Sequence, residues 1–150
     1  MTELRILETV TAFAAEIDQR CCDGCDECGA RCTSGVPMLR PEYERIRVYL
    51  DSDAGAEARL AEQADKQVPY PGTDDVFYTA CRFRDVERGR CSIYPVRPLV
   101  CRLFGHVEWL PCPIQKVPST APGALDVMRH YGEAEQRTYE EWAGSEPSAG

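Results

Sequence analysis

Four cysteines at short and regular intervals are the residues of this sequence best suited to chemistry. Two residues separate Cys22 from Cys25 and Cys25 from Cys28, and three separate Cys28 from Cys32. This spacing wraps the backbone so that the first three sulfurs converge on one point, while the fourth either shares that point or reaches a second one. The run therefore predicts a metal site held by a loop.

The same spacing occurs in bacterial ferredoxins, whose fourth cysteine ligates the other cluster in two-cluster proteins. The alternative is a disulfide framework, because nine cysteines in 150 residues is well above the content of an ordinary domain. Such a framework requires export, and residues 1–20 show no basic start, no continuous apolar core and no small-residue cleavage site. We therefore expect a cytoplasmic protein, in which reducing conditions keep thiols available for metal binding or catalysis.

Net charge and hydropathy argue against two classes of partner. A charge of −8 repels phosphate backbones and anionic membrane surfaces, so we expect no binding to nucleic acid and none to membranes. No apolar stretch approaches the roughly 20 residues that a membrane-spanning helix requires. The negative charge is more compatible with a basic protein as a partner than with DNA. We expect one domain over residues 1–150, with a core over about residues 4–143 and a flexible tail over 144–150.

The apolar periodicity predicts several helices around the cysteine run. Apolar residues recur at three- and four-residue spacing from Leu4 to Cys21, which is typical of an amphipathic helix with one buried face. Cys21 lies on that face, so we interpret it as a core thiol and leave it out of the site. The other predictions are helices from Pro41 to about Asp51, over Ala54–Lys66 and over Pro122–Trp142, and a connector over Gln67–Asp75.

The second half of the chain presents its cysteines in short elements. Val76–Phe83 and Cys91–Tyr94 are β-prone and flank a turn-like segment, which predicts a small hairpin with Cys81 and Cys91 near its base. A helical turn then presents Cys101, and Cys112 lies between two prolines that limit the entropy lost when a ligand is immobilised. The predicted fold class is mostly α with a small β-hairpin, a compact, cysteine-rich and metal-centred single domain.

Together these residues resemble the YkgJ-type cysteine-cluster family, also called the zinc- or iron-chelating CxxCxxCC domain. The resemblance covers roughly Cys22 to Cys112, and its most specific part is the segment Cys91-Ser-Ile-Tyr94-Pro-Val-Arg97-Pro98-Leu-Val-Cys101-Arg102. The sequence departs from the family pattern at one place. The family has adjacent cysteines at the end of the first run, whereas Gly29 follows Cys28 here.

The resemblance implies a metal centre held by eight cysteines, in a family whose members mostly lack an established activity. We assign the fourth position of the first run to Cys32, the nearest available sulfur. The predicted metal ligands are then Cys22, Cys25, Cys28, Cys32, Cys81, Cys91, Cys101 and Cys112. Flagellin lysine methylases carry a similar domain, so the resemblance also implies, by analogy alone, a link to protein methylation.

Eight thiols form two complete sets of four, which fits two 4Fe–4S clusters or two all-thiolate zinc sites. The two-residue spacings of the first run favour iron and sulfide. Structural zinc usually takes two separate Cys-x2-Cys pairs, and the four later cysteines contain no such pair. We therefore expect one or two iron–sulfur clusters, with zinc or mononuclear iron as the alternative. The sequence does not divide the thiols between two centres.

Basic and imidazole side chains near the later cysteines complete the site predictions. Arg97 and Arg102, close to Cys101, are predicted to stabilise the negative charge of the sulfurs without binding metal themselves. The arginines of the predicted hairpin are interpreted as surface residues. His106 is an additional candidate ligand, but eight thiols already fill two sites, so it is not assigned to the metal.

Three functions are compatible with these residues. The first is an iron–sulfur protein that carries electrons or supports a redox enzyme together with a redox or protein partner. The second is a structural zinc module that presents a surface to a protein. The third is an accessory component of a protein methyltransferase, although no glycine-rich fingerprint follows a strand to hold a methyl donor. No catalytic triad or acid–base pair is recognisable, so activity as an oxidoreductase or within a methyltransferase is left open.

Overall fold

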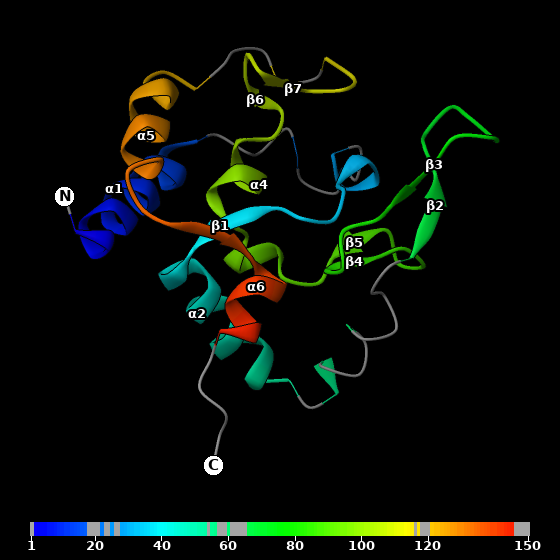
Figure 1. Ribbon diagram of the computed structural model, residues 1–150. Helices are drawn as coiled ribbons and strands as arrows, with labels where there is room; N and C mark the ends of the chain where they lie inside the picture. The colour runs from blue at the N-terminus through cyan, green and yellow to red at the C-terminus, as the bar shows by residue number, and fades with distance from the viewer. Residues whose placement is uncertain are drawn as a thin grey trace.

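The computed structural model describes residues 2–17, 22, 25, 28–53, 55–56, 60, 66–115, 117 and 121–145. Most of its regular structure consists of short helices (Figure 1). They are α1 (Glu3–Glu16), α2 (Arg40–Asp51), α4 (Leu99–Leu103), α5 (Ala124–Tyr131) and α6 (Tyr139–Gly144), with single 3₁₀ turns η2 (Gly29–Arg31) and η3 (Tyr94–Val96). None of the described helices is long and apolar enough to cross a membrane.

The strands of the described residues form four separate antiparallel pairs. They are β1 (Pro37–Leu39) with β8 (Gln136–Thr138), β2 (Gln67–Pro69) with β3 (Phe77–Thr79), β4 (Arg84–Asp85) with β5 (Arg90–Cys91), and β6 (His106–Val107) with β7 (Leu110–Pro111). The expectation of one small hairpin was therefore too simple. The predicted connector contains β2, and the β-prone segment before Cys81 pairs with β2 rather than with the segment at Cys91.

Strand β1 separates two hydrophobic cores, because consecutive residues of a strand point to opposite faces. Met38 packs into the α2–α6 core, which contains Tyr43, Ile46, Leu50, Ala56, Leu60, Phe83, Ile93, Tyr139 and Trp142. Leu39 packs into the α1–α5 core, which contains Ile6, Val10, Leu99, Leu103, Val107, Ala124, Val127 and Tyr131. Each core thus joins N-terminal, central and C-terminal segments.

The N-terminal helices follow the apolar pattern of the sequence. Thr2 caps α1 by accepting a hydrogen bond from the backbone N–H of Arg5, and α1 ends at Glu16, earlier than predicted. Residues 18–21, including Cys21, lie outside the described part of the chain. The helix predicted from Pro41 to about Asp51 is confirmed as α2. The helix predicted over Ala54–Lys66 lies mostly outside the described residues.

The single C-terminal helix predicted over Pro122–Trp142 was wrong. The structure divides this segment into α5 and α6, with β8 between them. Strand β8 is required as the partner of β1, with Met38 opposite Arg137. Helix α6 then begins at a capping box, in which the backbone N–H groups of Thr138 and Glu141 each donate to the side chain of the other residue. The pairing of β8 with β1 therefore interrupts the helix that the sequence predicted over this segment.

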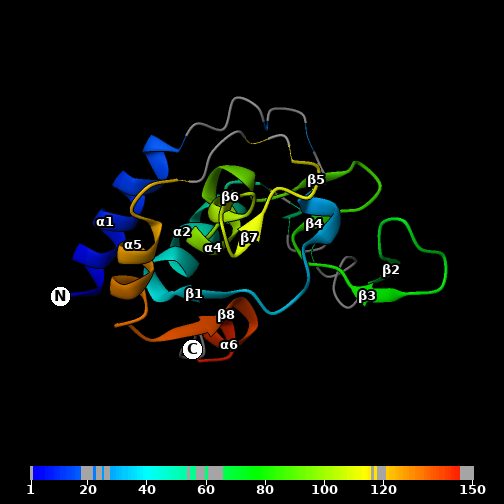
Figure 2. The same ribbon diagram turned by 90° about the horizontal axis from the view of Figure 1, so that it is seen from above.

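The β2–β3 hairpin projects from the body of the molecule (Figures 1 and 2). The bridge between Thr33 and Ala80 joins its base to the segment that follows the first cysteine run. The two bridged residues are the chain neighbours of Cys32 and Cys81, so the bridge holds these two cysteines near each other.

Candidate metal centre

All eight predicted cysteines line one cavity of about 330 Å³. The cavity lies between the N-terminal cysteine run and the elements from β4 to β7, so it joins segments that are far apart in the chain. The eight described cysteines are partly buried thiols, and no disulfide bond joins any two of them. Metal ligation stays a prediction; the structure brings all eight thiols to the lining of one cavity.

Backbone hydrogen bonds position the cysteines of the first run. Cys25 donates to the carbonyl of Cys22, and Arg31 donates to the carbonyl of Cys28, both at 3.0 Å. The second of these bonds belongs to the tight turn η2, which places Cys28 and Cys32 at its two ends. The backbone N–H of Cys81 then donates to the carbonyl of Cys32 at 3.0 Å, which joins the two halves of the chain at the cavity.

The later cysteines are held by short elements, largely as the sequence predicts. Arg84 pairs with Cys91 in the β4–β5 ladder, and the Arg84 N–H donates to the Cys81 carbonyl at 3.0 Å. Cys81 and Cys91 therefore lie at the base of a hairpin, although a shorter one than predicted. Cys101 lies in the middle of α4, and Cys112 directly follows β7.

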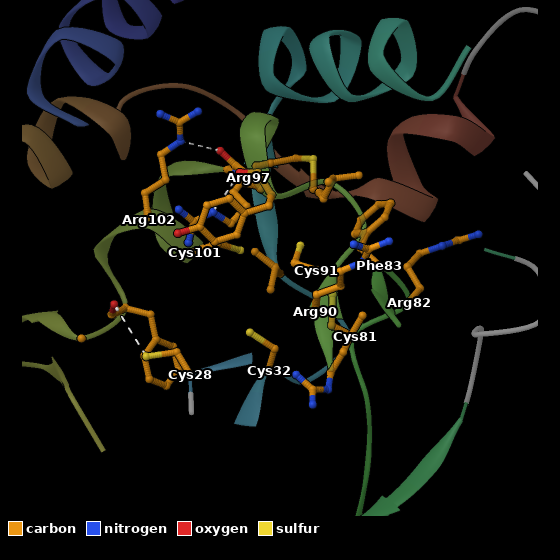
Figure 3. Close-up of a pocket in the computed structure, with 18 of the residues that line it drawn as sticks. Cys28, Cys32, Cys81, Arg82, Phe83, Arg90, Cys91, Arg97, Cys101 and Arg102 are labelled. Atoms are coloured by element: carbon orange, nitrogen blue, oxygen red, sulfur yellow. Dashed lines mark hydrogen bonds between the residues drawn. The ribbon is translucent and has the colours of Figure 1, made fainter. Parts of the chain in front are cut away.

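We sort the eight thiols into two groups by the cysteines whose charges act on Cys28 and on Cys101; the two groups adjoin each other, because Cys28 also raises the pKa of Cys32. Charges on Cys112, Cys22 and Cys25 act on Cys28, which defines a first thiol group of these four residues. Charges on Cys32, Cys81 and Cys91 act on Cys101, which defines a second thiol group of these four. Figure 3 shows the members of the second group around a common space, with Cys28 to one side. The turn η2 joins the two groups.

Burial is the largest influence on the protonation of these thiols. It raises the pKa of Cys28 and of Cys32 to about 12 and that of Cys81 to about 11, and it raises the pKa of Cys101 well above its ordinary value. These pKa values already include a smaller contribution from neighbouring cysteines, because two ionised sulfurs repel each other. Without a cation the four groups are therefore protonated at neutral pH. A bound metal would reverse this by stabilising the thiolates.

Gly105 allows the β6–β7 hairpin to approach the first thiol group closely. Its backbone adopts a positive φ of 89°, which L side chains rarely adopt. A Cβ at this position would lie 3.4 Å from Cys28 Sγ and 3.8 Å from Cys112 Cα. The next residue, His106, is only 4% exposed, and its Nε2 lies 3.5 Å from Cys22 Sγ.

Arg97 and Arg102 shape the segment that leads to Cys101. Arg97 donates from Nε to the Tyr94 carbonyl, and its guanidinium stacks 3.8 Å from the centre of the Tyr94 ring. Arg102 donates to the carbonyls of Arg97 and Pro95, each at 3.0 Å. The positive charge of Arg97 also lowers the pKa of Cys101, against the larger effect of burial. Both arginines line the cavity with Cys101, and their predicted role in stabilising the sulfurs stays a prediction.

The structure adds residues that the sequence interpretation missed. Arg84 was interpreted as a surface residue of the hairpin, but it lines the cavity and its charge lowers the pKa of Cys32. Arg82 and Arg90 line the same cavity. The sequence carried no signal for Arg84, because its proximity to Cys32 depends on the pairing of chain segments. His106 was considered as a ligand from the sequence and was not assigned, and the structure places it beside Cys22.

The donor atoms are gathered but not yet at coordination distance. Within the described residues, no group of three or more Cys, His, Asp or Glu side chains lies close enough together to hold a metal ion. Rotation of side chains around the cavity would be needed to complete a site. The donor set itself is soft, since thiolates with a nearby imidazole suit zinc and iron–sulfur centres rather than magnesium or calcium.

Comparison with known proteins identifies the sequence pattern. Residues 20–139 match the family profile CxxCxxCC, described as "Putative zinc- or iron-chelating domain". The match covers most of the chain, includes all eight cysteines of the cavity and confirms the predicted resemblance. No curated protein and no solved structure matches the chain significantly.

Proposed function

Because the chain belongs to the CxxCxxCC family of zinc- or iron-chelating domains, we propose that it is an iron–sulfur protein in which each thiol group holds one 4Fe–4S cluster. The observation that carries this proposal is the single cavity of about 330 Å³ lined by all eight thiols. Four sulfurs around one zinc ion lie about 2.3 Å from the metal and hence roughly 3.8 Å from one another. The cavity extends beyond the sulfurs to Gly89 and Glu140, and it has room for centres of several atoms. The two-residue spacings of the first cysteine run favour iron and sulfide over zinc.

The proposed role is to carry electrons or to support a redox enzyme. When bound, a 4Fe–4S cluster supplies reversible one-electron transfer, with a potential set by its net charge and by the hydrogen bonds to its sulfurs. The chain contributes the thiolates, the buried setting and the cations of Arg31, Arg84 and Arg97, which each lower the pKa of a nearby thiol. The turn η2 joins Cys28 of the first group to Cys32 of the second, and Cys28 acts on the pKa of Cys32, so two centres would be close enough to exchange electrons.

Metal and sulfide analysis of anaerobically purified protein tests the proposal. We expect about eight iron atoms and about eight sulfide ions per chain, four of each per cluster. The protein should be brown, its visible absorption should decrease with dithionite, and the reduced protein should give a paramagnetic resonance signal. A colourless protein that contains zinc and no sulfide would contradict it.

Paired substitutions test the division into two groups. Cys28 and Cys32 lie on either side of η2 but belong to different groups. Cys28→Ser and Cys32→Ser should therefore each remove about half of the iron. Adding Cys112→Ser to Cys28→Ser should remove little more, because both residues serve the first group. Adding Cys101→Ser to Cys28→Ser should remove nearly all of the iron. Equal losses in the two double variants would contradict this division.

A structural zinc module is the second candidate, and the projecting β2–β3 hairpin favours it. Tyr70, Val76 and Phe77 are 41%, 53% and 58% exposed on or beside this hairpin, an unusual display of large apolar side chains. A zinc-stabilised domain would use this surface to contact a protein. The metal analysis above separates the two candidates. A role within a protein methyltransferase rests on the family resemblance alone and stays a prediction.

A further inference from the structure

Cys22 and His106 approach each other at the edge of the first thiol group, although 84 positions separate them. The distance from Cys22 Sγ to His106 Nε2 is 3.5 Å. An iron of a 4Fe–4S cluster is already bonded to three sulfide ions and takes one ligand from the protein. Ligands of two different irons point to separate corners of the cluster and lie farther apart than 3.5 Å. Two donors this close, which contact each other as a hydrogen-bonding pair, therefore suit the same iron as alternative ligands, one in place of the other.

The backbone holds His106 in this position. His106 pairs with Pro111 in the β6–β7 ladder, and its carbonyl accepts a hydrogen bond from Ala121 N–H at 2.6 Å. Because Cys112 follows Pro111, the hairpin presents an imidazole and a thiol of the first group together. Gly105 provides the close approach of this hairpin to Cys28.

Burial supports a specific role for this imidazole. His106 is 4% exposed and lines the cavity with the cysteines. The other histidine, His130, lies on α5 beside Glu133 and does not line the cavity. Among the described residues, only the first thiol group therefore has an imidazole next to it. This group offers five donors for the four irons of one cluster.

We propose that Cys22 and His106 converge on one iron of the first cluster, so that either side chain can hold it. This inference rests on the proposed iron–sulfur function. It makes the two centres unequal, since the second thiol group supplies four thiolates and, within the described part of the chain, no imidazole beside them. The corner shared by Cys22 and His106 is then the one at which a ligand can be exchanged without loss of the iron.

A set of substitutions tests this redundancy. Cys22→Ala and His106→Ala should each retain about eight iron atoms per chain, whereas the double variant should lose iron from the first cluster. Cys28→Ala is the matched control, because it removes a thiol of the same group that has no histidine beside it among the described residues. This control should lose iron as a single variant. Cys22→Ser replaces Cys22→Ala if the alanine variant is poorly folded by circular dichroism.

A spectroscopic measurement identifies the replacement ligand directly. In Cys22→Ala labelled with ¹⁵N-histidine, pulsed paramagnetic resonance of the reduced cluster should show a strong nitrogen coupling that is lost in the double variant. The inference is overturned if Cys22→Ala loses as much iron as Cys28→Ala, or if it retains the iron without a histidine coupling. Wild-type protein without iron and sulfide would overturn the proposed function itself, and that result is visible before any variant is made.

Discussion

Glu42 accepts a hydrogen bond from the backbone N–H of Leu99 at 2.7 Å. Leu99 begins α4, which carries Cys101, so this bond ties the second thiol group to α2. The other carboxylate oxygen accepts hydrogen bonds from the Leu39 N–H and the Tyr131 hydroxyl. Burial raises the pKa of Glu42, and these three donors partly offset the rise. One buried carboxylate therefore connects the helical framework to the cavity.

Replacing Glu42 should weaken both the fold and the second thiol group. In Glu42→Gln, an amide NH₂ replaces one of the two carboxylate oxygens, so in either orientation the N–H of Leu99 or of Leu39 loses its acceptor. We expect a loss of about 1–3 kcal/mol in the free energy of unfolding. We also expect faster loss of iron to a chelator. Urea denaturation and chelation kinetics measure the two effects.

Glu44→Gln is the matched control for this substitution. Glu44 lies on the same helix but is exposed, and it forms a surface ion pair with Arg40 at 3.6 Å. Such pairs contribute roughly 0–1 kcal/mol, so this variant should resemble wild type. Equal effects of the two substitutions would show that the Glu42–Leu99 contact has no special role.

Gly105→Ala should disturb the first thiol group selectively. The substitution combines a positive φ with a Cβ placed 3.4 Å from Cys28 Sγ. Gly72→Ala provides the control, because Gly72 has a similar φ of 84° and nothing within 4 Å of its Cβ position. Both variants should lose roughly 1–2 kcal/mol of stability from backbone strain. Only Gly105→Ala should reduce the iron content, and an equal reduction in Gly72→Ala would contradict the role assigned to Gly105.

Stability of the metal-free chain should fall at alkaline pH. The pKa values of Cys28, Cys32 and Cys81 are about 12, 12 and 11 in the folded chain, above the ordinary value of 9.0. Between these limits the folded state binds more protons than the unfolded state, so the free energy of unfolding decreases as the pH rises from about 9 towards 12. Below pH 9 this contribution is fully present. Urea denaturation at several pH values measures the decrease.

The metal-loaded chain should behave differently, because its thiolates are already deprotonated. Loading near neutral pH should release protons, and metal affinity should rise with pH. A pH-stat records the release. Metal uptake without proton release would show that the buried thiols are not the ligands.

Arg84→Gln should lower the reduction potential of the second centre. The charge of Arg84 lowers the pKa of Cys32, and the same charge would stabilise the more negative, reduced state of a cluster. Arg88→Gln is the control, since Arg88 lies on the same hairpin but is itself exposed and pairs with Asp85 at 3.6 Å. Redox titration followed by paramagnetic resonance measures both potentials. A similar shift in the two variants would indicate a general charge effect.

Local patterns explain what could be predicted for the fold. The apolar spacing in α1 and α2 is a property of neighbouring turns, and the helical turn at Cys101 follows two prolines. The strand pairs were harder, because no strand was predicted at β1 or β8, and β3 pairs with β2 rather than with the segment at Cys91. Short strands of two or three residues carry too little pattern to specify their partners.

The sequence by itself determined the family and the set of eight thiols at the cavity, because residue types and short spacings are written directly in the chain. Only the tertiary structure decided how those thiols divide. Cys28 lies with Cys112 and Cys32 lies with Cys81, although Cys28 and Cys32 are separated by a single turn. The tertiary structure alone also decided that Arg84 and His106 lie near cysteine sulfurs. Their proximity to sulfur depends on contacts between distant segments, and spacing along one segment carries no information about such contacts.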